Sequence, residues 1–539
     1  MKKRPHIVIL NPDEMRWDTM GHMGNRAAYT PVLDQLAVHE AVSFDHAYCQ
    51  NPVCVPSRCS FLTGLYPHTR GHRTMQYLLH EDEPTLFSEL KDAGYYVWLN
   101  GRNDFLSGNI NGLEQKHANE VYYYVNLKNR IMKKQPLQEV EKKTYSHFHG
   151  VVDKVANDMD WQDTNAAIER IKHMEDLGDQ PLCLFLGWVN PHPPYEVEKP
   201  YYDKIREDYI SSEIDPKEQK NKSLMIEKLQ EYSGLEDLSE EEWKEMRHVY
   251  LAQCAKVDAM TGAVCQALKD AGIYEDTAIF FLSDHGDFCG DYHLAEKAQN
   301  TFEDVLTRVP FLIKPPKGIM TDAGIAASPV ELVDLYATVM DIAGVECRHD
   351  HFGRSLVDIL SDRTKSVRTY AFAEGGRLPQ EKQCDEWHAS GENGPQKTDE
   401  YWAKKRAQRD DQAHEKGTMI TDGHYKFVYR AASERHEFYD LSTDPYELKN
   451  LYPEIHSGQD RKEYRDVICR MKEKLLGWFQ ETVDTVPKSM DSRFTEEKIW
   501  ASLRNMVPPE KEDEVRQYIR EEHPTIMQAI VKVMRSMIS

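Results

Sequence analysis

The stretch Cys54-Val55-Pro56-Ser57-Arg58-Cys59-Ser60-Phe61-Leu62-Thr63-Gly64 is the part of the chain around which its other features are arranged. An early proline suits the first turn of a helix and a glycine suits its end, so we expect a helix that begins near Cys54. The dipole and free N–H groups of a helix N-terminus favour an anion, and Arg58 adds a planar positive charge one turn later. The stretch therefore predicts a site for a tetrahedral oxyanion such as sulfate or phosphate. An ordinary capped helix with a buried cysteine is the alternative.

Composition limits the kinds of partner that this anion site can have. The chain has 539 residues, enough for a large core and more than one domain. Its 67 basic and 90 acidic residues give a net charge of −23 without a long basic block. This argues against nucleic acid or a membrane as the main partner. A site for an anion must therefore concentrate its own positive charge.

The N-terminus and the cysteines suggest where the protein works. Only four apolar residues, Ile7-Val8-Ile9-Leu10, follow the basic start, which is too few for the core of a signal peptide. No later segment is long and apolar enough to span a membrane. The ten cysteines lack the paired spacing of zinc sites. We expect a reduced, cytoplasmic protein; a secretion signal trimmed from the sequence is the alternative.

Short apolar runs alternate with amphipathic segments over the first 340 or so residues. The runs typical of strands are 6–10, 42–49, 95–99, 181–189, 278–282 and 309–313. The segments typical of helices are 30–39, 85–93, 163–174, 246–271 and 330–343. This alternation predicts an α/β fold with a large, mostly parallel sheet flanked by helices.

The pattern changes in the last third of the chain. Residues 424–429 and 437–441 alternate like strands of a small antiparallel sheet, and the sequence after about 490 is helical. We therefore expect three parts: a catalytic domain (1–365), a smaller C-terminal α+β subdomain with a short antiparallel sheet and a helix (366–490), and a helical extension (491–539). The extension is suited either to oligomerisation, including a homo-oligomer, or to capping the small subdomain.

Polar side chains follow four of the predicted strands. They are Asp13 and Glu14, Asn100 to Asp104, His192, and Asp284 with His285. Because ligands of α/β proteins bind beyond the C-terminal ends of the strands, we expect these residues to meet beside Cys54 and Arg58. Each group alone is also compatible with a solvated turn.

Taken together, Cys54-x-Pro-Ser-Arg, the following Ser-Phe-Leu-Thr-Gly and these strand ends resemble the type I sulfatases of the alkaline phosphatase superfamily. The resemblance spans most of residues 5–455. It implies a sulfuric ester hydrolase in which a formylglycine-generating maturation enzyme converts Cys54 to formylglycine. One hydroxyl of the hydrated aldehyde would attack the sulfur of a small sulfate monoester, either a sulfated sugar or an aryl or steroid sulfate.

The resemblance also implies a metal centre. Asp13, Glu14, Asp284 and His285 would bind one divalent metal together with the formylglycine derived from Cys54. Three carboxylates favour Ca²⁺. Mn²⁺ and Mg²⁺ stay open, because His285 supplies a nitrogen and because Glu14 stands where many sulfatases have a second aspartate.

Carried over position by position, the resemblance gives roles to five further side chains. Arg58 and Lys297 would hold the sulfonate oxygens, and His192 would protonate the leaving-group oxygen. Many sulfatases have Gly-Lys-x-His at residues 101–104, where this chain has Gly-Arg-Asn-Asp. Arg102 would replace the lysine at the sulfate. Asp104 would either act as the base that resets the hydrate or only pair with a cation.

Substrate specificity is predicted to come from the variable segments 105–155, 197–245 and 377–416, and His72 is a candidate substrate contact. Two other functions remain open from the sequence. One is a phosphonate monoester or phosphodiester hydrolase of the same superfamily. The other is a non-catalytic oxyanion- or glycan-binding protein whose Cys54 is never converted.

Overall fold

The computed structural model describes residues 4–124, 148–155, 158–391, 394–395, 401–457, 461–486, 493–522 and 524–538. By its internal contacts the chain divides into two compact units. The first comprises Met1–Cys347 and His351–Thr485, and the second comprises Arg348–Asp350 and Val486–Ser539. Residues 125–147 of the predicted variable segment 105–155 fall outside the described residues.

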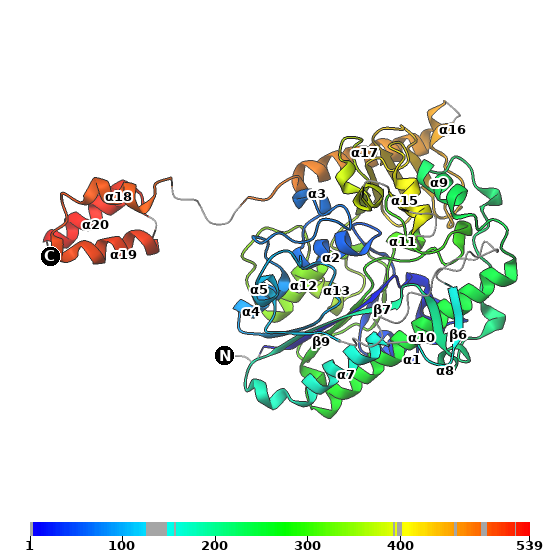
Figure 1. Cartoon of the computed structure of the whole chain (residues 1–539), viewed down its shortest axis with the longest axis horizontal. Coiled ribbons are helices and arrows are strands. Elements are labelled where there is room, and N and C mark those ends of the chain that lie inside the picture. Colours follow the sequence, from blue (N-terminus) through cyan, green and yellow to red (C-terminus); the bar gives the residue numbers. More distant parts are fainter. Residues whose placement is uncertain are drawn as a thin grey trace. The chain divides into compact units, whose positions relative to one another are not determined.

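An eight-stranded sheet is the centre of the first unit (Figure 1). Its strands, in spatial order, are β11 (Gly324–Ala326), β2 (Val42–Phe44), β10 (Phe311–Lys314), β9 (Thr277–Leu282), β1 (His6–Asp13), β7 (Leu182–Pro191), β4 (Tyr96–Asn100) and β5 (Glu120–Tyr122). All neighbours are parallel except that β10 runs antiparallel to both β9 and β2. The predicted large, mostly parallel sheet is confirmed.

Side chains of β1 alternate between the two faces of this sheet, as the twofold period of a strand requires. Ile7 and Ile9 belong to the core on one face, and Val8 and Leu10 belong to the core on the other. Both faces are therefore buried under helices, which explains the unbroken apolar run in the sequence.

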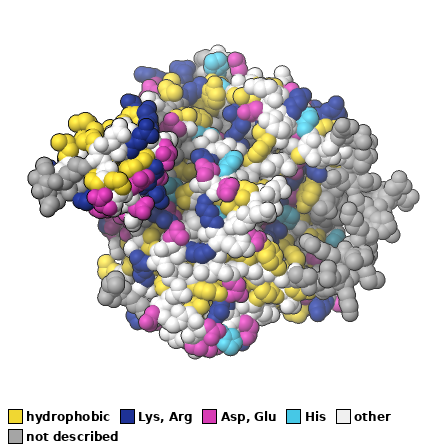
Figure 2. Space-filling view, turned by 60° about the vertical axis from the view of Figure 1, so that its left-hand side comes forward, with side chains coloured by type: hydrophobic (Ala, Val, Ile, Leu, Met, Phe, Trp, Pro, Cys, Tyr) yellow, Lys and Arg dark blue, Asp and Glu magenta, His cyan; other side chains and the backbone are white. Residues whose placement is uncertain are grey.

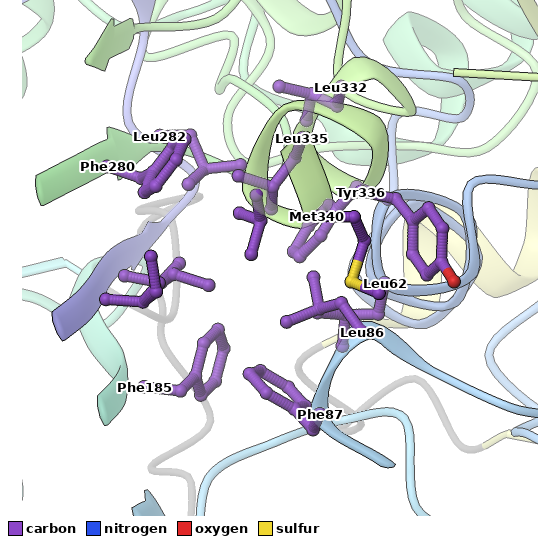
Figure 3. Packing of buried hydrophobic residues seen from close by; sticks show 14 of the residues in the cluster. Leu62, Leu86, Phe87, Phe185, Phe280, Leu282, Leu332, Leu335, Tyr336 and Met340 are labelled. Atoms are coloured by element: carbon purple, nitrogen blue, oxygen red, sulfur yellow. The ribbon is translucent and has the colours of Figure 1, made fainter. Parts of the chain in front are cut away.

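Helices cover both faces. The first face is covered by α2 (Cys54–Thr63), α4 (Leu86–Asp92), α12 (Asp334–Ala343) and α13 (Val357–Ser361). The second is covered by α1 (Pro31–His39), α7 (Met159–Lys172) and α10 (Glu240–Asp270). Figure 3 shows Leu62 of α2 and Tyr336 and Met340 of α12 packed together with Phe280 of β9 and Phe185 of β7.

Four predicted elements differ clearly from the structure. The predicted strand 42–49 is two strands in different sheets, β2 and β3 (Ala47–Tyr48). α7 begins at Met159 with Asp158 as its N-cap, so the predicted start at 163–164 was wrong. Asp163 instead lies inside the helix and accepts a hydrogen bond from Asn100. α10 begins six residues before the predicted 246 because Ser239 forms a capping box with Glu242. The predicted helix 330–343 is a short strand, β12 (Val330–Glu331), followed by α12.

A second, antiparallel sheet lies near the end of the first unit. Its strands are β13 (Ala371–Gly375), β14 (Gly417–Thr421), β15 (Tyr425–Arg430) and β16 (Glu437–Asp440). The helices around it are α9 (Leu224–Ser233), α14 (Glu386–Ala389), α15 (Trp402–Gln408), α16 (Tyr452–His456) and α17 (Lys462–Thr482). This confirms the predicted small antiparallel sheet.

The second unit contains three helices with a hydrophobic cluster of their own. They are α18 (Glu496–Leu503), α19 (Glu512–Glu522) and α20 (Ile526–Ile538). Trp500, Ile519 and Val533 are among the residues buried between them. The sequence after 490 is therefore helical, as predicted.

All ten cysteines are free thiols. Among the described residues, no helix has the length and apolar character needed to cross a bilayer. The face of the molecule in Figure 2 mixes basic and acidic side chains. No large basic patch stands out on that face.

Candidate active site

Cys54 is the first residue of α2, as the proline and glycine positions predicted. Every residue of this helix is buried, and Cys54 itself is only 3% exposed. The helix is fixed to the end of β9 because the hydroxyl of Ser57 donates to the carbonyl oxygen of Asp284 at 2.6 Å. The free N–H groups of the helix N-terminus therefore face the edge of the sheet where β1 and β9 end.

Arg58 links two carboxylates from different strands. Its Nε donates to Oδ2 of Asp284 at 2.8 Å and its Nη2 donates to Oδ2 of Asp13 at 3.1 Å. None of the three side chains is exposed. Burial would raise the pKa of Asp13, but the guanidinium groups of Arg102 and Arg58 outweigh it and hold that pKa well below its ordinary value. Asp13 is therefore an ionised carboxylate in the interior.

The sulfur of Cys54 lies against two of the predicted metal ligands. It is 3.5 Å from Oδ1 of Asp13 and 3.2 Å from Nε2 of His285. Asp13, Cys54, Asp284 and His285 each offer one ligand atom, and these four atoms lie within 4.8 Å of one another. Burial and the Asp13 charge raise the pKa of the Cys54 thiol well above its ordinary value, so the unmodified side chain is a poor nucleophile here.

Glu14 is a buried carboxylate without hydrogen bonds. Its backbone is left-handed, with φ of 65°, and neither carboxylate oxygen has a hydrogen-bond partner within the described residues. Burial raises its pKa well above the ordinary value, although Lys297 opposes this shift. A buried carboxylate is normally hydrogen-bonded, paired or bound to metal. The oxygens of Glu14 lie 3.3 Å from Nζ of Lys297 and 3.5 Å from Nε2 of His192. Together with Asp13 and His192, Glu14 forms a second group that could hold a cation, and Asp13 is shared with the group of Cys54, Asp284 and His285.

Arg102 follows β4 and donates to Oδ2 of Asp13, so both arginines bind the same carboxylate. Gly187 in β7 makes room for this arrangement. A Cβ atom there would lie 2.4 Å from the carbonyl oxygen of Arg102 and 3.2 Å from Nη1 of Arg58. The glycine is therefore required for the two guanidinium groups to approach Asp13 side by side.

His192 and Lys297 form the opposite wall of the site. Nε2 of His192 lies 2.7 Å from Nζ of Lys297, and Nδ1 of His192 faces the carbonyl oxygen of Pro193. These partners assign the proton of the neutral ring to Nδ1 and leave Nε2 as the acceptor from Lys297. Burial and the Lys297 charge lower the pKa of His192 well below its ordinary value.

Two other predicted residues are placed differently. Asp104 is half-buried with φ of 51°, and within the described part of the chain its carboxylate makes no hydrogen bond or ion pair. His72 is buried with Nε2 2.9 Å from both carboxylate oxygens of Glu83 and Nδ1 3.0 Å from the carbonyl oxygen of Tyr77. The described contacts of His72 therefore lie outside the group around Cys54.

The sequence analysis missed two residues of the site. Glu296 contacts Lys297 at 2.9 Å, and Lys404 of α15 contacts Glu296 at 3.3 Å. Lys404 lies in segment 377–416, which was predicted to supply specificity, but nothing in its local pattern marks it. The one feature of the sequence that could have indicated Glu296 is its position next to Lys297.

A cysteine at a helix N-terminus, a group of side chains that could hold a metal ion and several cations meet at the C-terminal edge of one mostly parallel sheet. This arrangement suits the transfer of a group that carries several negatively charged oxygens.

Comparison with known proteins gives the family. The model of the sulfatase family matches residues 5–345, so the chain belongs to that family and is a hydrolase of sulfate esters. Arylsulfatase K of Danio rerio is 27% identical over 66% of this chain and 68% of its own. Choline-sulfatase of Rhizobium meliloti (strain 1021) is 25% identical over 93% of this chain and 92% of its own.

A solved structure confirms the fold. The phosphonate monoester hydrolase of Agrobacterium radiobacter matches with a TM-score of 0.68 and 21% identity, covering 89% of this chain and 96% of its own. At this identity the likeness concerns the fold alone. The phosphonate hydrolase alternative is therefore a relative of the same architecture, whereas the family match places this chain among the sulfatases.

Proposed function

We propose that this sulfatase acts through formylglycine made from Cys54. The observation that carries the proposal is the position of the Cys54 sulfur, buried at the start of α2 between Asp13 and His285. A hydrated aldehyde at this position would supply a hydroxyl nucleophile. The thiol with its raised pKa would not.

Asp13, Glu14, Asp284 and His285 would hold one divalent metal together with the converted Cys54. Ca²⁺ is our first choice because three of the ligands are carboxylates, and Mn²⁺ or Mg²⁺ is the alternative. The bound cation would lower the pKa of the nucleophilic hydroxyl and offset the negative charge of the substrate. The assignment is supported by Asp13, Cys54, Asp284 and His285, whose ligand atoms lie within 4.8 Å of one another, and by Asp13 and Glu14 sharing a second such group with His192.

Arg58, Arg102 and Lys297 would bind the sulfonate oxygens. All three side chains are fixed by partners on the protein before any substrate arrives. Preorganised cations of this kind stabilise the charge that develops as the ester oxygen leaves. In a buried site their effect is larger than in water.

His192 would deliver the proton to the leaving-group oxygen. In the structure Nε2 of His192 accepts a hydrogen bond from the Lys297 ammonium. The proton between the two nitrogens is therefore shared by His192 and Lys297. Protonating the ester oxygen through Nε2 requires Lys297 to give up that proton or His192 to take one from solvent. We therefore treat His192 and Lys297 as one acid.

Asp104 is the candidate base for resetting the hydrate. Its charge raises the pKa of Arg102 and Arg58 together with Asp13, so pairing with these cations is the alternative role. Asp104→Asn is expected to lower turnover of an aryl sulfate by about 10²-fold while metal content stays the same. Unchanged turnover would remove Asp104 from the mechanism.

Mass spectrometry of the Cys54 peptide tests the proposal directly. The protein should be produced in a host with a maturation enzyme, and the peptide should carry an aldehyde that reacts with a hydrazide. Cys54→Ala, produced in parallel, is the control that must be inactive and unlabelled. An active protein whose Cys54 is fully unmodified would contradict the formylglycine proposal.

The substrate is proposed to be a small sulfate monoester, either a sulfated sugar or an aryl or steroid sulfate. Rates on an aryl sulfate and on the matching aryl phosphonate, measured side by side, distinguish it from a phosphonate as the preferred substrate. The ten free thiols support a reducing, cytoplasmic location. A maturation enzyme is the one protein partner that the proposal requires.

A further inference from the structure

The ammonium of Lys297 is surrounded by acceptors. Nε2 of His192 lies 2.7 Å from its Nζ, Oε1 of Glu296 lies at 2.9 Å and Oε1 of Glu14 lies at 3.3 Å. An ammonium has three N–H donors, so three acceptors are as many as it can serve. A sulfonate oxygen can therefore reach Lys297 only if one of these three groups gives way.

Of these acceptors, Glu296 has a second cation beside it. Its two carboxylate oxygens lie 3.3 and 3.5 Å from Nζ of Lys404. Lys404 is 7% exposed, and its ammonium also lies over the ring of Tyr401, 4.4 Å from the centroid. Two lysines from distant parts of the sequence thus compete for one buried carboxylate.

The backbone of Glu296 is held in place while its side chain lies between these cations. Its φ is 64°, a left-handed conformation that is strained for a residue with a side chain. Its N–H lies 3.1 Å from both Oδ1 of Asp287 and the hydroxyl of Tyr195, and its carbonyl accepts from the N–H of Phe288 at 3.0 Å. A change of partner is therefore a side-chain rotation that leaves the loop unmoved.

We propose that Lys404 draws Glu296 away from Lys297 when the sulfate ester binds, which makes Lys404 a positioning residue of the active site. The inference rests on the proposed role of Lys297 in holding the sulfonate. Without Lys404, the carboxylate loses the cation that competes with Lys297. It then stays on Lys297 and repels the incoming anion.

Inorganic sulfate is the probe, measured as a competitive inhibitor of the converted, metal-loaded enzyme. Lys404→Met is expected to raise the inhibition constant of sulfate about 10-fold. It should raise KM for an aryl sulfate by a similar factor, with kcat little changed. Lys404→Arg keeps the charge and should stay within about 3-fold of the parent. A kcat that falls with unchanged KM and unchanged sulfate inhibition would overturn the proposal.

The double variant Lys404→Met/Glu296→Gln separates positioning from a structural role. Removing the Glu296 charge should restore sulfate binding to within about 3-fold of the parent, because the competitor has gone. If Lys404 only supported the fold, the losses of the two substitutions would add. Additive losses would therefore overturn the proposal.

Glu296→Gln alone keeps the proposal testable if Lys404→Met does not fold. This variant should bind sulfate at least about 3-fold more tightly than the parent. Unchanged or weaker binding of sulfate would overturn the inference. Lys297→Met separates this inference from the proposed function. If Lys297→Met leaves sulfate inhibition unchanged, the role of Lys297 itself fails. If it weakens sulfate while Lys404→Met and Glu296→Gln have no effect, only the present inference fails.

Discussion

The first unit contains two buried clusters of charged side chains that differ in how their carboxylates are satisfied. One is the active site. The other, which we call the sheet cluster, lies against the antiparallel sheet and consists of Lys222, Glu303, Asp304, Lys426 and Glu447. The side chains of both clusters are almost completely removed from solvent. The difference between them indicates which cluster is built for structure and which for binding.

In the sheet cluster the ammonium groups serve backbone and side-chain acceptors together. Lys426 donates to Oδ1 of Asp304 at 2.6 Å and to the carbonyl oxygen of Phe302 at 2.8 Å, and it pairs with Glu447. The free carboxylate oxygen of Glu447 accepts from the N–H of Asp304 at 2.7 Å. This network fixes the sheet to the segment before α11 (Asp304–Thr307) without any added group.

In the active site Glu14 and Glu296 share the ammonium of Lys297, and Asp13 and Asp284 share the guanidinium of Arg58. Glu14 has two oxygens without hydrogen bonds, and Asp13 faces the Cys54 sulfur and His285 as well as two arginines. A cluster that leaves buried acceptors unsatisfied is unstable by itself, because each costs about 1–3 kcal/mol. Both carboxylate oxygens of Glu14 in the active site, against one oxygen of Glu303 in the sheet cluster, are without a hydrogen bond among the described residues, which favours a further cation beside Glu14.

The largest expected effect comes from removing one buried cation from each cluster. Arg58→Met should lower kcat/KM at least about 10³-fold in metal-loaded protein, because sulfate loses a fixed guanidinium. Lys426→Met should instead lower the free energy of unfolding by about 3–5 kcal/mol, because it leaves buried carboxylates unpaired. Activity per folded molecule, measured beside urea unfolding, should be unchanged for Lys426→Met. Equal loss of activity per folded molecule in both variants would show that the two clusters do not differ in their role.

A smaller effect is expected from neutralising one carboxylate in each cluster. Glu14→Gln should weaken divalent-metal binding at least about 10-fold, yet stabilise the metal-free protein by about 1–3 kcal/mol, since burial of the carboxylate raises its pKa despite the nearby Lys297. Glu303→Gln should destabilise the protein because Lys222 loses its carboxylate partner, with metal affinity unchanged. Metal titration and thermal unfolding with and without a chelator give both quantities. A metal-free protein destabilised by Glu14→Gln would contradict the inference of a further cation beside Glu14.

The last expected effect, about 2 kcal/mol between pH 6.5 and pH 5, concerns a neutral group near the antiparallel sheet. Burial, together with Arg377 and Arg73, lowers the pKa of His414 to about 3. Neither of its ring nitrogens has a hydrogen-bond partner in the described residues. Because the unfolded chain binds a proton below about pH 6.5 and the folded chain does not, unfolding free energy should fall as pH falls from 6.5 towards 3. The slope from this group is about 1.4 kcal/mol per pH unit.

His414→Phe isolates that contribution. The variant should be close to the parent in stability at pH 7.5, since no hydrogen bond is lost, and more stable than the parent at pH 5. Urea unfolding at the two pH values provides the measurement. A parent and variant with the same pH dependence would show that His414 does not titrate as described.

The sequence predicted those parts of the site that depend on local pattern. Asp13, His192 and Asp284 follow apolar runs, and the geometry of parallel strands brings such positions to one edge. The helix from Cys54 was predictable because proline and glycine mark its two ends. The roles assigned to these residues came from the resemblance to sulfatases and remain predictions.

What could not be predicted depends on contacts between distant segments. Lys404 reaches Glu296 across more than one hundred residues of intervening sequence, and neither belongs to a periodic pattern. The start of α7 was missed because Asp158 and Asp163 are both good N-caps by composition. Only the contact of Asp163 with Asn100 decides between them. The local sequence indicates which residues could serve as N-caps or site residues, and tertiary contacts determine which of them do.

The burial of α2 bears on whether Cys54 is modified before or after the chain folds. Only 3% of Cys54 is exposed, and the helix that follows it is enclosed by the core along its whole length. A second enzyme has no route to that sulfur once the first unit has folded. The proposed conversion must therefore precede folding, during or soon after synthesis. Maturation enzyme added to purified, unconverted protein should leave it inactive, whereas the same enzyme co-expressed with the chain should activate it.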